Sequence, residues 1–134
     1  MAKIIDIEGI GEVYAGKLQE IGIETTDQLL KCGVRPQDRN AIAEATGISG
    51  KLVLEWVNRA DLFRIKGVAE EYSDLLEVAG VDTVPELAQR NPENLHKKLG
   101  EANAEKQVVR RLPSKAQVAD WVAQAKDLDR VITY

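Results

Sequence analysis

The chain has 134 residues, of which 44% are hydrophobic, and this is enough to build one core or two small units that share one. A single cysteine, Cys32, and a single histidine, His96, exclude a disulfide framework, a zinc cluster and a Cys/His catalytic pair within one chain. The net charge of −4 neither demands nor excludes nucleic acid, because local patches matter more than the total. We expect Cys32 to be a small buried apolar group and His96 to be solvated.

No apolar run reaches the length of a signal peptide or a membrane span. We therefore expect a cytoplasmic protein with no membrane partner.

The first expected helix follows the glycine turn Gly9-Ile10-Gly11. Its apolar stripe has helical spacing and consists of Val13, Tyr14, Leu18 and Ile21. Gly22 supplies the left-handed residue that favours a helix end. Thr25 and Gln28 have the spacing of a capping box, which predicts the start of a short connector helix that runs to Lys31.

A second turn, Gly47-Ile48-Ser49, separates two further expected helices. Pro36 suits the first turn of the helix before it, which we expect to end near Thr46. Ser49 is the expected cap of the helix after it. The core-facing residues of that helix are Leu52, Val53, Trp56, Val57 and Ala60. Trp56 is therefore interpreted as a structural residue and not as a base-stacking platform.

The sequence then repeats itself. At an offset of 58, residues 7–30 match residues 65–88 with eight identities in 24 positions, at Ile7, Gly9, Glu12, Tyr14, Leu18, Gly22, Thr25 and Leu29. At an offset of 65, the helix of Trp56 matches the helix of Trp121. The expected helix starts of the second copy are at Thr83, Pro92 and Ser114.

The change of offset indicates a seven-residue insertion in the second copy, which we place in the basic segment Lys106 to Pro113. We expect two units, 1–62 and 63–134, with this insertion in the second. Trp56 and Trp121 should occupy equivalent buried places.

The pattern hydrophobic-x-Gly-hydrophobic-Gly, present as Ile7-x-Gly9-Ile10-Gly11, resembles the hairpin of helix-hairpin-helix proteins. Gly47-Ile48-Ser49 resembles a second, degenerate hairpin. Two hairpins joined by a connector helix are the plan of a double helix-hairpin-helix unit. The resemblance therefore implies an all-α fold of two tandem units that share the central Trp56 helix. The whole chain is also similar to a bacterial family of tandem helix-hairpin-helix proteins known as a domain of unknown function, and this likeness supplies no activity.

Helix-hairpin-helix proteins hold the phosphates of a duplex with backbone amides, so the resemblance implies weak, sequence-independent binding of double-stranded DNA. Glycine lets the backbone approach a ligand, and the next helix offers unpaired N–H groups at the positive end of its dipole. Carried over to this chain, the expected phosphate-binding residues are Gly9, Ile10, Gly11, Lys17, Gly47, Ser49, Lys51, Arg110, Arg111 and Lys115.

The third hairpin, Gly67-Val68-Ala69, has lost one glycine and is followed by Glu70 and Glu71. Acidic residues in a first helical turn suit the dipole but repel a phosphate. We expect this hairpin to be structural. Because Glu8 and Glu12 flank the first hairpin as well, the expected affinity is near the non-specific range of roughly 10⁻⁴ to 10⁻⁶ M.

A second reading of the chain remains open, in which it is a protein–protein interaction or scaffold module. The net charge and the acidic turn at Glu70 favour that reading. The basic segment Lys106 to Lys115 fits a solvated loop and an anion-binding patch equally. The sequence contains no phosphate loop, dinucleotide fingerprint or specified carboxylate cleft, so we expect no enzymatic activity, cofactor or metal.

The two ends of the chain, Ala2 to Ile7 and Arg130 to Tyr134, are richest in strand-favouring residues. We expect both to be extended and either to pair with each other or to lie along the helical body. Pairing between molecules would instead make the chain a dimer. The sequence leaves the oligomeric state open.

Overall fold

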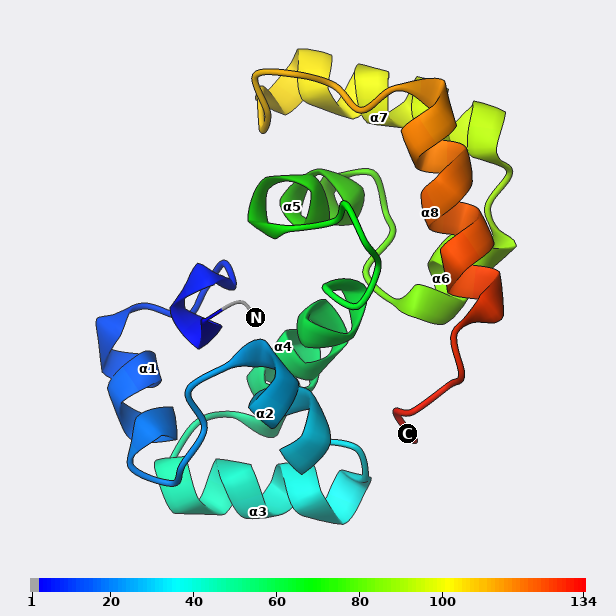
Figure 1. Cartoon of the computed structure of the whole chain (residues 1–134). Helices are drawn as coiled ribbons and strands as arrows, with labels where there is room; N and C mark the ends of the chain where they lie inside the picture. Colours follow the sequence, from blue (N-terminus) through cyan, green and yellow to red (C-terminus); the bar gives the residue numbers. More distant parts are fainter. Residues whose placement is uncertain (1–2) are drawn as a thin grey trace. The chain divides into compact units, whose positions relative to one another are not determined.

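The computed structural model describes residues 3–134, and over this range the chain is all-α (Figure 1). Its elements in chain order are the 3₁₀ turn η1 (Ile4–Asp6) and the helices α1 (Glu12–Gln19), α2 (Thr26–Cys32), α3 (Pro36–Thr46), α4 (Gly50–Leu62), α5 (Glu70–Val78), α6 (Val84–Gln89), α7 (Pro92–Lys106) and α8 (Lys115–Asp127). None of these helices combines the length and the apolar surface that crossing a membrane would require.

The chain divides into two compact units. The first contains the residues up to Asp61 together with Arg130–Tyr134, and the second runs from Leu62 to Asp129. The break after Asp61 lies one residue from the boundary expected from the repeat. The last five residues, which the sequence division placed in the second unit, belong to the first. The Thr133 N–H shows why, because it donates to the Val34 carbonyl at 2.9 Å.

The first unit builds its core from all four of its α-helices. Its buried apolar residues include Ala15, Leu18, Ile23, Leu29, Ile42, Ile48, Val53, Trp56, Val57 and Ala60. The expected start of α2 is confirmed by two hydrogen bonds. The Thr25 hydroxyl accepts the Gln28 N–H at 3.2 Å, and the Gln28 side chain accepts the Thr25 N–H at 3.2 Å. Pro36 opens α3, as predicted, and Gly47 ends it in the left-handed conformation.

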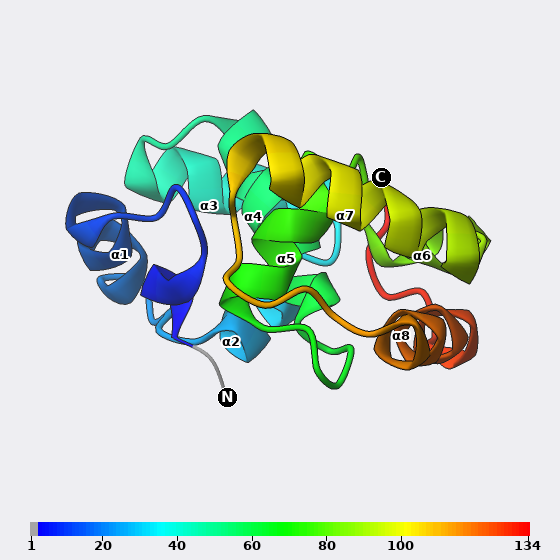
Figure 2. The same ribbon diagram turned by 90° about the horizontal axis from the view of Figure 1, so that it is seen from above.

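The second unit encloses a hydrophobic cluster to which α5, α6, α7 and α8 all contribute. Helix α8 packs against α6 and α7, and α7 also packs against α5; Figure 2 shows α8 nearly end-on. The completely buried members of the cluster include Leu62, Leu75, Leu76, Val81, Leu87, Leu99 and Val118. The capping box at Ser114 is confirmed. Thr83 caps α6, but the Glu86 carboxylate pairs with Arg90 at 3.3 Å, so the expected box there is only half formed.

Trp56 and Trp121 occupy equivalent buried places, as the repeat predicts. They are 3% and 1% exposed. The ring of Tyr14 lies 5.3 Å from that of Trp56, and the ring of Tyr72 lies 5.3 Å from that of Trp121. Each tryptophan helix has 13 residues. Both tryptophans are therefore core residues of their units.

The extra residues of the second copy lie in two places. Helix α7 has 15 residues where α3 has 11, and residues 107–114 follow α7 where residues 47–49 follow α3. We expected the insertion to be confined to Lys106 to Pro113, and this expectation is wrong. The physical reason is the helix end: Gly47 stops α3 early, whereas α7 continues until Gln107 takes the left-handed conformation, at φ +50°.

Three side chains are more exposed than the sequence predicted. Val13 and Ile21 are 71% and 40% exposed, because Val13 lies in the first turn beside the open glycine turn and Ile21 lies beyond the end of α1. Cys32 is exposed, so the expectation of a buried thiol is wrong. Its neighbour Gly33 is the buried residue, and a Cβ there would be only 2.5 Å from Cγ2 of Val57.

The two ends of the chain each contact a loop of the first unit. Ala2 lies outside the described residues. The expectation of an extended N-terminal end is wrong for Ile4–Asp6, which form a 3₁₀ turn, while Lys3 makes an isolated antiparallel bridge to Thr25. Arg130–Tyr134 have no helix or strand and contact the loop before α3 through Thr133.

Candidate nucleic-acid interface

The turn before α1 exposes two glycines and buries the residue between them. Gly9 has a φ of +94°, and Ile10 is only 3% exposed. The Ile10 N–H donates to the Ile7 carbonyl at 3.1 Å, which closes the turn. A Cβ on Gly9 would lie 3.5 Å from Nε1 of Trp56. The turn therefore rests on the core through Ile10 and on the indole of Trp56.

The N-terminus of α1 lacks a side-chain cap. Gly11 is its N-cap residue and makes no side-chain hydrogen bond, whereas Thr25, Asn91 and Ser114 each accept an N–H group of the helix that they precede. The first N–H groups of a helix have no partner within it and lie at the positive end of its dipole. A Cβ on Gly11 would meet no atom within 4 Å. An anion therefore has open access to this helix end.

Charged side chains near this turn carry both signs. Glu8 and Glu12 are exposed, and Glu12 lies in the first turn of α1. Lys17 lies in the last turn, six residues after Gly11, which corresponds to roughly 9 Å along the helix axis. Lys17 and the open amides therefore lie at opposite ends of α1. A single small anion cannot contact both, whereas a chain of phosphates spans that distance.

The turn before α4 has the same plan but fewer open amides. Gly47 is exposed with a φ of +73°, and Ile48 is buried at 4% exposure. The Thr46 hydroxyl accepts the Ile48 N–H, and the Ser49 hydroxyl accepts the Lys51 N–H, both at 3.2 Å. Ser49 therefore caps α4, as predicted, and its hydroxyl already occupies one amide. The exposed Lys51 ammonium remains the main group here for an anion.

The turn before α5 is fastened by a glutamine from α8. The Gln124 side chain accepts the Lys66 N–H at 2.8 Å and donates to the Lys66 carbonyl at 3.0 Å. Gly67 keeps the φ of +94° found at Gly9. Glu70 and Glu71 are exposed in the first turn of the helix that follows. These contacts agree with the structural role that we expect for this turn.

The basic loop, residues 107–114, is held at three points by side chains of the second unit. Asn103 accepts the Val109 N–H at 2.9 Å and donates to the Val109 carbonyl at 3.1 Å. The Tyr72 hydroxyl donates to the Arg111 carbonyl at 3.1 Å. His96 is half-buried, with Nε2 at 3.1 Å from the Pro113 carbonyl oxygen, so the expectation of a solvated histidine is wrong.

Holding the loop in this way leaves its cations at the surface. Arg110 and Arg111 are exposed, and so is Lys115 at the start of α8. Leu112 is 41% exposed between them. The backbone of this loop is therefore fixed while its guanidinium groups face solvent.

The ten candidate residues belong to three segments of the chain. The turns before α1 and α4, with Lys17 and Lys51, belong to the first unit, and the basic loop with Lys115 belongs to the second. The sequence did not predict the contacts of Gln124 with Lys66 and of Asn103 with Val109, because no local sequence pattern indicates them. Within residues 3–134, no three His, Cys, Asp or Glu side chains gather as metal ligands would.

Comparison with known proteins gives a family without an assigned activity. Residues 8–128 match the family described as Domain of unknown function (DUF4332). No curated protein and no solved structure matches the chain.

Proposed function

Because the chain belongs to the DUF4332 family, whose description assigns no activity, we propose its function from the geometry: it is a non-enzymatic protein that binds double-stranded DNA weakly and without sequence preference. The observation that carries this proposal is the uncapped N-terminus of α1 behind an exposed two-glycine turn. Such helix ends are general phosphate sites. We propose further that each unit is a double helix-hairpin-helix, with α2 and α6 as the connector helices.

A duplex is a better ligand than a small anion because the cations of the first unit are dispersed. Lys17 lies at the far end of α1, and Lys51 lies on α4. A polyanion gains from both, and each neutralised phosphate contributes about −0.9 to the slope of log K against log salt. Glu8 and Glu12 oppose the same contact. The expected affinity therefore stays within roughly 10⁻⁴ to 10⁻⁶ M.

The exposed valine in the first turn of α1 supports the same surface. Val13 is 71% exposed and follows the two-glycine turn by two residues. An apolar side chain next to phosphate-binding amides fits the minor groove, where many proteins place apolar residues against the DNA. Burial of Val13 against a sugar edge would recover the free energy that its exposure costs in the unbound chain.

The test is a titration of a short duplex at several salt concentrations. For the wild-type chain we expect a linear fall of log K with log salt. Gly11→Val should abolish binding and leave the fold intact, because the φ of Gly11 is −86° and a Cβ there meets nothing. Lys17→Glu should weaken binding equally for all sequences and reduce the slope by about one.

Control variants locate the contact. Gly16→Ala, in the interior of α1 and also without a neighbour within 4 Å, should bind as the wild type does. Arg110→Glu with Arg111→Glu tests the basic loop as the rival contact. If binding survives Gly11→Val but is lost with the two arginines, the basic loop is the DNA site. If wild-type binding is absent at low salt, the proposal of DNA as the ligand is wrong.

One observation favours the alternative of a protein-binding module. Glu70 and Glu71 stand exposed at the start of α5, whose N-terminus has no side-chain cap. A basic partner would be attracted to these carboxylates, and DNA would be repelled. Loss of binding to a protein partner in Glu70→Lys with Glu71→Lys, with no DNA binding by the wild type, would support this alternative.

A further inference from the structure

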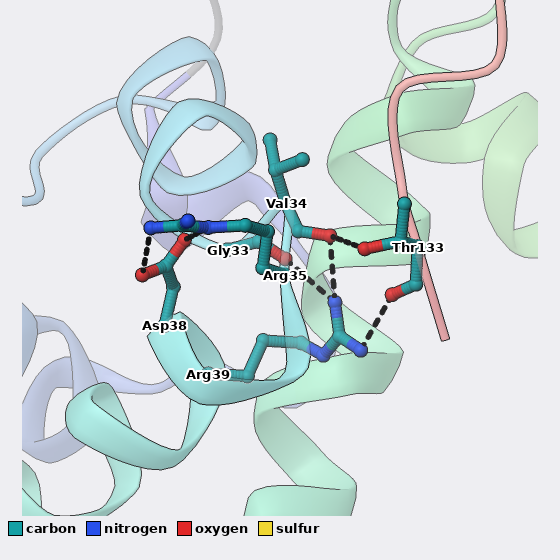
Figure 3. Close-up of polar contacts among 6 residues, drawn as sticks. All are labelled: Gly33, Val34, Arg35, Asp38, Arg39 and Thr133. Atoms are coloured by element: carbon teal, nitrogen blue, oxygen red, sulfur yellow. Dashed lines mark hydrogen bonds and ion pairs between the residues drawn. The ribbon is translucent and has the colours of Figure 1, made fainter.

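A buried arginine in α3 joins the last residues of the chain to the body of the first unit. Arg39 is only 6% exposed. Its Nη1 atom donates to the Gly33 and Val34 carbonyls at 2.9 and 3.1 Å, and its Nη2 atom donates to the Thr133 carbonyl at 2.7 Å (Figure 3). The guanidinium thus binds main-chain oxygens from two segments that lie far apart in the sequence.

The acidic residue that precedes Arg39 is paired with a different arginine. Figure 3 shows the Asp38 carboxylate facing the Arg35 side chain, from which it accepts two hydrogen bonds at 2.9 and 3.2 Å. The Asp38 carboxylate is therefore engaged by Arg35. Buried guanidinium groups need acceptors, and the docked Thr133 carbonyl is one of three that Arg39 uses.

Residues 131–134, which we call the strap, are bound by four kinds of contact. Ile132 is buried at 2% exposure. The Thr133 N–H and the Thr133 hydroxyl donate to the Val34 carbonyl at 2.9 and 3.2 Å, and the Thr133 carbonyl accepts from Arg39. The Tyr134 ring lies 5.9 Å from Cζ of Arg39, and its hydroxyl donates to Oδ1 of Asn58 at 2.8 Å.

All of the strap's own contacting groups lie beyond the end of α8 at Asp127. They are the main chain and hydroxyl of Thr133 and the side chains of Ile132 and Tyr134. The segment between α8 and the strap, residues 128–130, has no helix or strand. An element that is short, that carries its own main-chain and side-chain contacts and that is connected by an irregular segment is suited to exchange between identical chains.

We propose that the strap site, formed by Gly33, Val34, Arg39 and Asn58, accepts residues 131–134 of a second copy of this chain, so that two chains associate by exchanging straps. Within one chain the strap has an effective concentration in the range of about 1 mM. The strap of a second copy therefore competes with the chain's own strap only at high protein concentration, or when one chain has lost its own strap contact.

Complementary full-length variants test this directly. Arg39→Gln disrupts the strap site and keeps the strap, whereas Thr133→Pro removes the N–H and the hydroxyl that donate to the Val34 carbonyl and keeps the strap site. Each variant alone should sediment as a monomer. Their equimolar mixture should form a dimer with one intact strap contact. In ¹⁵N-labelled Thr133→Pro, the amide signals of Val34 and Arg39 should shift on addition of unlabelled Arg39→Gln.

A matched variant controls for the change at position 133. Thr133→Ser keeps both the N–H and the hydroxyl that donate to the Val34 carbonyl, so its own strap stays bound and its mixture with Arg39→Gln should contain several-fold less dimer. If Arg39→Gln does not fold by circular dichroism, Asn58→Ala replaces it, because it removes the Tyr134 hydroxyl acceptor from the other side of the site. A mixture that remains monomeric, or an Arg39→Gln variant that dimerises alone, overturns the proposal.

Discussion

Gly67 lies directly against Trp121, so that a Cβ added to this glycine would stand 3.0 Å from the indole Nε1. Gly9 has the same relation to Trp56, at 3.5 Å, and both glycines have a φ of +94°. The repeated sequence thus encodes a repeated contact, in which a buried tryptophan supports the backbone of a glycine turn. Each turn needs its glycine for conformation, and the second turn needs it for space as well.

Gly67→Ala should therefore destabilise the chain more than Gly9→Ala. A non-glycine residue in the left-handed region costs about 1–2 kcal/mol, and this applies to both positions. At Gly67 the close approach to Trp121 adds about 1 kcal/mol or more of overpacking. Urea unfolding followed by tryptophan fluorescence measures the difference. Gly11→Ala, with a negative φ and open space, should stay within about 0.5 kcal/mol of wild type; equal losses at Gly9 and Gly67 would contradict the packing argument.

Gly33→Ala should be destabilising for a steric reason that one further change relieves in part, because an added Cβ would also lie 3.1 Å from the Leu29 carbonyl oxygen. A Cβ on Gly33 would lie 2.5 Å from Cγ2 of Val57, which is completely buried. We expect a loss of about 1–3 kcal/mol. Val57→Ala removes the clashing methyl groups, so the double variant should lose less than the sum of the two single variants. An additive double-mutant cycle would show that the strain lies elsewhere.

The all-helical fold and the tryptophan positions could be predicted because their signals are local or repeated. The Thr25 and Ser114 capping boxes need only a fixed spacing of three residues. The placement of Trp56 and Trp121 follows from apolar periodicity and from the match at an offset of 65. The turn before α1 was predicted as a candidate site for the same reason.

The features that the sequence did not reveal depend on distant partners. Arg39 looks like a surface arginine on an amphipathic helix, and its acceptor on Thr133 is 94 residues away. Gln124 binds Lys66 across 58 residues. The exposed Val13 and Cys32 are the reverse case, in which an apolar residue type suggests burial and the short helices turn it outward. Tertiary packing decides these long-range contacts and exposures, and the periodicity of the sequence does not predict tertiary packing.

Gly16→Ala should stabilise the first unit. Gly16 lies inside α1, and a Cβ there meets no atom within 4 Å. Alanine in a helix interior is favoured over glycine by about 0.5–1 kcal/mol, because it has less backbone entropy to lose on folding. The midpoint of urea unfolding should rise without a change in slope. A loss of stability would mean that Gly16 serves a contact other than the helix itself.

Asn103→Ala should release the basic loop. It removes both hydrogen bonds between the Asn103 amide and the backbone of Val109, and a buried backbone group left without a partner costs about 1–3 kcal/mol. The amide of Val109 should then exchange with deuterium much faster, which nuclear magnetic resonance measures directly. Asn103→Asp keeps the oxygen that accepts the Val109 N–H, so its effect on that amide should be smaller. Unchanged exchange in both variants would show that Tyr72 and His96 suffice to hold the loop.

Stability at acid pH should report the surface pair of Arg35 and Asp38. The hydrogen bond from Arg35 lowers the pKa of the Asp38 carboxyl below its ordinary value of 3.8. A carboxyl with a lowered pKa in the folded state stabilises the fold above its unfolded pKa, and this contribution is lost as the pH falls through the folded pKa. The difference in stability between the wild type and Asp38→Asn should therefore be present at neutral pH and shrink as the pH falls below the unfolded pKa of about 3.9 and through the folded pKa. Arg35→Met should return the pKa of Asp38 upward, which a carbon-detected titration of the carboxyl measures. Because both groups lie at the surface, added salt should reduce the shift in the pKa of Asp38. A pKa of Asp38 that is the same with and without Arg35 would rule out this pair as the cause of the shift.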